Sequence, residues 1–149
     1  GEAYWISMSI DNKIPTVAYV DRVNGNKTVV KRYADNDWQS LGFASDGESS
    51  FSAVYVENGI PYVVYQDATQ NHKATMKTYN GSNWVLVGDA GFTLGIASYI
   101  SLWVHNRVPT VSYINYSNQV EVMVYDDKVY FTNDFDITDT NNAGDGLTN

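Results

Sequence analysis

Apolar and polar residues alternate in three short segments of the chain. The apolar positions of these segments are, in order, Met8 and Ile10, Val54 and Val56, and Leu102 and Val104. A period of two is typical of a β-strand with one buried face, whereas a helix repeats every three to four residues. The pattern therefore predicts strands over residues 7–10, 53–56 and 101–104.

A second strand follows each of these, and each second strand opens on a proline. Pro15, Pro61 and Pro109 lie 46 and 48 residues apart, and valine, tyrosine and an acid or amide follow each of them in register. Proline harms a strand least at its first residue, because little of the ladder is lost there. Asn58-Gly59, between the first two strands of the middle copy, favours a tight hairpin. Third strands are expected over residues 27–33, 73–79 and 119–125, and fourth strands from residues 38 and 84.

The repeat divides the chain into residues 1–46, 47–94 and 95–134, with an acidic tail or linker over residues 135–149. A period of about 46 residues without helical spacing is typical of the four-stranded blades of β-propellers. We therefore expect an all-β fold of three four-stranded antiparallel meanders, arranged as propeller-type blades. The third copy lacks the tryptophan and glycine that end the other two, so its outer strand is expected to be degenerate.

Three blades are fewer than the four to eight of typical closed propellers. The second strand of the middle copy is apolar on both faces, with Val63 and Tyr65 on one and Val64 on the other. Such a sheet needs a neighbour on each side. The simplest explanation of the recurring valine, tyrosine and tryptophan is packing between blades. We expect an incomplete ring that homo-oligomerisation or further blades of a longer chain complete.

Composition and charge narrow the classes of partner. The 149 residues include 17 acidic and 9 basic side chains, a net charge of −8, and no cluster of lysine or arginine. Nucleic acids and anionic membrane surfaces repel such a chain. Cysteine is absent, which excludes disulfides and cysteine-ligated metals. No apolar run is long enough to span a bilayer.

The repeat resembles a family of tandem-repeat β-propellers of microbial surface and secreted proteins, over about residues 1–134. The matching residues include Pro61, Val63, Tyr65, Asp67, Tyr79, Gly81, Trp84, Val87, Gly88, Gly95, Ala97, Ser101 and Leu102. The resemblance implies propeller blades and an extracellular or cell-surface location. It does not specify an activity, because propellers host lectins, scaffolds and enzymes alike.

A polar position recurs at the end of each second strand and is the best candidate for ligand binding. Asp21, Asp67 and Asn115 occupy it, and the tyrosines two residues earlier are Tyr19, Tyr65 and Tyr113. A rim of such groups could accept hydrogen bonds from sugar hydroxyls or help to hold a cation. The alternative is that each acid or amide caps its own turn.

The tail resembles the Asp/Asn-rich calcium repeats of thrombospondin type-3-like linkers. Oxygen ligands at alternate positions and a glycine suit calcium, and the candidate ligands are Asp139, Asn141, Asp145 and Asn149. A flexible acidic linker is the simpler alternative. No cofactor is expected to be required, although calcium is a possible one.

Catalytic signatures are missing from the sequence. It has no Gly-x-Ser-x-Gly elbow, no His-Glu-x-x-His pair and no glycine-rich phosphate loop. We therefore expect a non-catalytic structural or adhesive module of an extracellular or cell-surface protein, which acts through self-association or protein binding. The alternative is a carbohydrate-binding, lectin-type propeller with a glycan as its partner.

Overall fold

The computed structural model of the protein describes residues 1–126 and 129–134. These residues form three four-stranded antiparallel sheets, each with its strands in chain order. The first sheet comprises β1 (Ala3–Asp11), β2 (Ile14–Asp21), β3 (Lys27–Ala34) and β4 (Asp37–Phe43). The second comprises β5 (Ser49–Glu57), β6 (Ile60–Asp67), β7 (Lys73–Tyr79) and β8 (Trp84–Leu86). The third comprises β9 (Ser98–His105), β10 (Val108–Ile114), β11 (Val120–Asp126) and β12 (Val129–Asp134).

The expected all-β class and the three four-stranded antiparallel meanders are confirmed. The only helix among the described residues is the short 3-10 turn η1 (Ala68–Gln70). The outer strand of the third sheet is present, because β12 pairs with β11 from Val129 to Asp134 despite the missing tryptophan and glycine. None of the described helices is long and apolar enough to cross a membrane.

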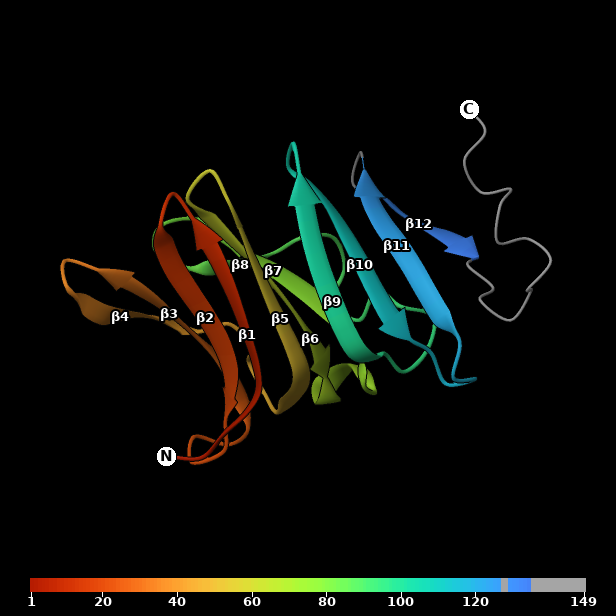
Figure 1. Ribbon diagram of the computed structural model, residues 1–149. Coiled ribbons are helices and arrows are strands. Elements are labelled where there is room, and N and C mark those ends of the chain that lie inside the picture. Colours follow the sequence, from red (N-terminus) through yellow and green to blue (C-terminus); the bar gives the residue numbers. More distant parts are fainter. Residues whose placement is uncertain (127–128, 135–149) are drawn as a thin grey trace.

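The three sheets stand side by side, with β1, β5 and β9 at neighbouring edges (Figure 1). Within residues 1–126 and 129–134 they form an open row and not a closed ring. The second sheet lies between the other two, which explains the burial of β6 on both faces from Pro61 to Asp67. Burial alternates instead in β10, where Val111 and Tyr113 face the second sheet.

The hairpins between the first two strands of each sheet have the same conformation. Their central residues have positive φ angles, at 48° and 66° for Asn12 and Lys13 and at 51° and 78° for Asn58 and Gly59. The third hairpin repeats this with 52° at Asn106 and 65° at Arg107. Two positive φ angles characterise the type I′ turn, whose twist matches that of the flanking strands.

Two hydrophobic clusters fill the spaces between the sheets. Between the first and second sheets lie Ala18, Val30, Ala44, Val54, Val63 and Tyr65. Between the second and third lie Tyr62, Val64, Ala74, Met76, Leu102, Val104, Val111, Tyr113 and Met123, among others. In both clusters, one face of a sheet packs on the opposite face of the sheet that precedes it. The facing apolar surfaces of neighbouring sheets are thereby removed from water, as in tandem-repeat proteins.

Candidate functional site

The recurring acid or amide at the end of β2, β6 and β10 caps its own turn. Asp21 Oδ1 accepts the backbone N–H of Val23 at 3.1 Å. Asp67 Oδ1 accepts the backbone N–H of Thr69 at 3.0 Å and caps η1. Asn115 Oδ1 accepts the backbone N–H groups of Ser117 and Gln119 at 2.8 and 3.0 Å. These contacts correspond to the turn-capping alternative, because the oxygens are already engaged within their own loops.

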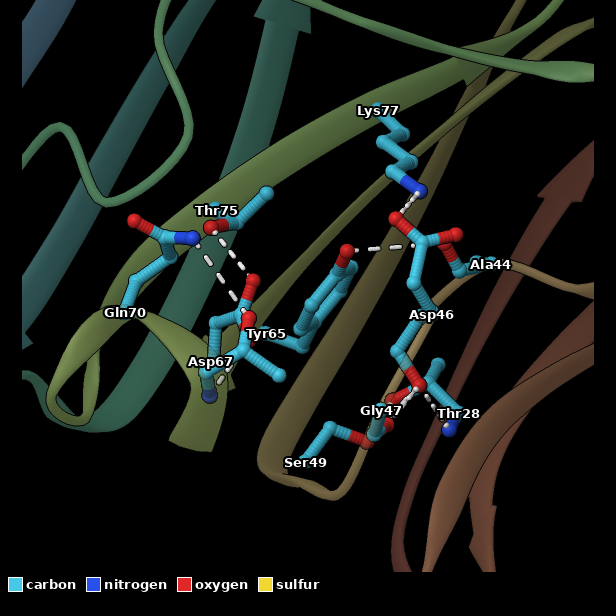
Figure 2. A network of polar contacts seen from close by, with 12 residues as sticks. Thr28, Ala44, Asp46, Gly47, Ser49, Tyr65, Asp67, Gln70, Thr75 and Lys77 are labelled. Carbon is cyan, nitrogen blue, oxygen red and sulfur yellow. Dashed lines mark hydrogen bonds and ion pairs between the residues drawn. The ribbon is translucent and has the colours of Figure 1, made fainter.

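Further side-chain contacts hold all three groups. The Asn115 side-chain amide donates to Glu121 Oε1 at 2.6 Å. Asp67 Oδ2 accepts the Thr75 hydroxyl at 2.9 Å inside the second sheet (Figure 2). Asp21 is half-buried, and the side-chain hydrogen bond from Asn24 is the main reason that its pKa is lowered. The structure thus places the three positions at equivalent strand ends and assigns each of them a local structural contact.

The tyrosines do not share an open site with these acids. Tyr65 and Tyr113 are 1% and 2% exposed and lie between sheets. The Tyr65 hydroxyl donates to Ala44 O at 3.4 Å (Figure 2), and the Tyr113 hydroxyl donates to Glu121. Burial is the first cause of the raised pKa of both phenols. Tyr19, at the equivalent position of the first sheet, is only half-buried.

That difference marks a surface which we call the open face, the face of the first sheet that carries Met8, Ile10, Val17 and Tyr19. The side chains of Met8 and Ile10 are 59% and 63% exposed. At the equivalent positions of the other sheets, the exposed fractions are 4% and 6% for Val54 and Val56, and 8% and 1% for Leu102 and Val104. The repeat therefore builds a face for burial, and in the first sheet no described residue covers it.

Backbone donors of β5 meet side chains of the first sheet at the edge where the sheets adjoin. The backbone N–H of Val54 donates to Ser7 Oγ at 3.1 Å, and that of Val56 donates to Ser9 Oγ at 3.0 Å. An unpaired edge strand exposes donors of this kind to unwanted partners. The two serines satisfy them and fix the register of one sheet against the next.

A carboxylate at the end of the first strand binds the hairpin of the following sheet. Asp11 Oδ2 accepts the backbone N–H of Gly59 at 2.7 Å. Glu57, its equivalent in the second sheet, accepts the N–H groups of Asn106 and Arg107 at 2.8 Å each. The third sheet has His105 at this position. We call this contact the carboxylate clamp. Sequence reasoning missed it, although the 46-residue offset between Asp11 and Glu57 was a signal.

Three aromatic residues at equivalent positions form a second feature that sequence reasoning missed. Trp5, Phe51 and Tyr99 have φ angles of 53°, 49° and 51°, next to irregularities in the strand pairing. The ring centroids of Trp5 and Phe51 are 4.0 Å apart, and those of Phe51 and Tyr99 are 4.9 Å apart. A left-handed backbone costs a bulky residue roughly 1–2 kcal/mol. The recurrence of an aromatic side chain at this offset was the available signal.

A groove runs along the inner edges of the three sheets beside these aromatic residues. It has a volume of about 520 Å³ and is lined by β1, β5 and β9, including Met8, Tyr55 and Ser101. Within the described part of the chain, no group of three or more histidine, aspartate or glutamate side chains could hold a metal ion. The predicted calcium ligands Asp139, Asn141, Asp145 and Asn149 lie outside the described residues.

Comparison with known proteins adds no family. No protein-family model matches the chain, and a search of the curated proteins found no match either.

Proposed function

We propose that the three sheets are propeller-type blades and that the chain is a non-catalytic structural or adhesive module of an extracellular or cell-surface protein. It acts by association of its open face with a further blade, supplied by a second copy or by another protein. The single observation that carries the proposal is the exposure of Met8 and Ile10, 59% and 63%, at positions buried in the other two sheets. Burying two such side chains contributes roughly 1.5–3 kcal/mol each.

The chemistry of the described surface supports binding over catalysis. The recurrent polar positions Asp21, Asp67 and Asn115 are engaged in turns, and repeated similar groups suit repeated packing better than the unlike acid and base of an enzyme. The net charge of −8 repels nucleic acids, which disfavours them as partners.

A carbohydrate-binding lectin is the second candidate, and the aromatic residues favour it. Trp5 and Tyr99 are 44% and 67% exposed, and they lie beside the groove that crosses all three sheets. Exposed aromatic rings with nearby polar groups are typical of small-molecule sites. Binding of calcium by the tail stays a prediction from the sequence.

The test is light scattering at micromolar and higher concentration, on the wild-type chain and on two variants. Ile10→Asp places a charge on the open face, whereas Val23→Asp places one on a side chain that is 72% exposed in the β2–β3 connection. The wild-type chain and Val23→Asp are expected to exceed the chain mass of 16.6 kDa, and Ile10→Asp is expected to match it. A wild-type monomer that binds simple sugars saturably would replace this function with the lectin.

A further inference from the structure

The two junctions between neighbouring sheets are built from the same repeat positions. In each junction, the front face of the later sheet packs on the back face of the earlier one; the front face is the one equivalent to the open face. Val54 at the first junction and Leu102 at the second are equivalent, and both are buried. Asp11 and Glu57 clamp the following hairpin at both junctions. The repeat positions therefore specify one way for a sheet to dock on the next.

The same chain carries both halves of a third junction of this kind. The open face of the first sheet supplies the front half. The back half is the outward side of the third sheet, where Ser101 is exposed and Trp103 is 53% exposed. Ser101 is equivalent to Ser7, whose Oγ accepts the backbone N–H of Val54 at 3.1 Å. Met8 is equivalent to Val54, so Ser101 offers an acceptor for the Met8 N–H of another copy.

We infer that the open face is occupied by the third sheet of a second copy of this chain, docked head to tail in the register of the two internal junctions. This inference rests on the proposed function and adds the partner, its polarity and its contact residues. Two copies joined at both ends would assemble six sheets, which lies within the range of closed propellers. Head-to-tail contacts that close in this way give a ring and not a filament.

The copy-to-copy junction lacks one device of the internal junctions. His105 stands where Asp11 and Glu57 provide carboxylates. Its counterpart is the Asn12–Lys13 hairpin of the second copy, whose φ angles of 48° and 66° match those of the clamped hairpins. The junction between copies is therefore weaker than the junctions within the chain, and association depends on concentration.

Complementation between two blocked variants tests the polarity. Ile10→Asp blocks only the front half, and Ser101→Asp blocks only the back half with the same added charge. Each variant alone is expected to be a monomer by sedimentation velocity. An equal mixture is expected to contain a species of about twice the chain mass of 16.6 kDa, because one junction stays intact. A Ser101→Asp variant that still pairs with itself would show front-to-front association and overturn the inference.

A gain of affinity tests the register. His105→Glu, placed in the Ile10→Asp chain of that mixture, installs the missing carboxylate opposite the Asn12–Lys13 hairpin. Two charge-assisted hydrogen bonds should lower the dissociation constant of the mixed pair about tenfold. This gain is net of the added repulsion from another negative charge. His105→Gln is the matched control, and we expect a smaller change from it because it adds no charge.

The outcomes separate this inference from the proposed function. Suppose that Ile10→Asp abolishes wild-type association but the mixture of variants stays monomeric, or the His105→Glu chain binds no tighter. Either result would overturn the head-to-tail register and leave the proposed function standing. A wild-type chain that stays monomeric to millimolar concentration would overturn this inference, and of the proposed function it would leave only docking on another protein.

Discussion

Removal of the Glu57 carboxylate should destabilise the packing of the second sheet against the third. In Glu57→Ala, the backbone N–H groups of Asn106 and Arg107 lose the acceptors that they now meet at 2.8 Å each. A charged acceptor normally adds more than a neutral one, but this hairpin is exposed and its N–H groups return to water. A contribution of about 0.5–1 kcal/mol per bond gives about 1–2 kcal/mol for the pair.

The assay is thermal and urea unfolding in an Ile10→Asp background, so that self-association does not contribute to the measured free energy. A loss of this size lowers the melting temperature by about 3–8 °C in a domain of this length. Glu57→Gln keeps one neutral acceptor, so its loss should be intermediate. Asp11→Ala removes a single inter-sheet bond, to Gly59 N at 2.7 Å, and should cost about half as much as Glu57→Ala. A Glu57→Ala chain within about 0.5 kcal/mol of its parent, the usual scatter of surface substitutions, would refute the clamp.

Two further predictions concern groups buried between the first and second sheets. Tyr65 has a raised pKa because it is buried, so the folded state binds its proton more tightly than the unfolded state does. This stabilisation is complete below the ordinary tyrosine pKa of about 10 and is lost as the pH rises above it. Tyr65→Phe should therefore reduce the fall in unfolding free energy at alkaline pH. An unchanged slope of unfolding free energy against pH would contradict this. Lys77 is 6% exposed and its Nζ lies 2.9 Å from Asp46 (Figure 2), whose side chain is 91% exposed. Lys77→Met should leave the free energy of unfolding in urea unchanged or raised, because Met123 fills the equivalent position of the third sheet. Asp46→Asn should lower that free energy by up to about 1 kcal/mol. A Lys77→Met chain less stable than the Asp46→Asn chain would contradict the reasoning.

The sequence contained enough to predict the sheets but not the full length of the inner strands. Alternation at Met8, Ile10 and their equivalents located the centre of β1, β5 and β9, and the prolines located the strands beside them. The structure extends β1 back to Ala3 and β5 back to Ser49. Bulges at Trp5 and Phe51 interrupt the period of two there, so an alternation argument stops short of them.

The candidate site was harder to predict because one repeat position can serve different purposes in different sheets. Tyr19, Tyr65 and Tyr113 look alike in the sequence, yet two are buried and one is half-buried. The difference depends on which sheets have a neighbour in front of them, and this is a property of the assembly and not of the local sequence. The clamp depends on a hairpin 49–50 residues away from Glu57, and sequence patterns do not reveal a side chain's partner at such a distance before the sheets are placed side by side.

Sedimentation equilibrium of the unaltered chain tests the central claim most directly, namely that the front face of the first sheet is a docking surface. The account predicts a mass that rises with concentration from 16.6 kDa toward about twice that value. A constant mass of 16.6 kDa up to millimolar concentration would show that Met8 and Ile10 are stable in water without a partner, and it would contradict the account.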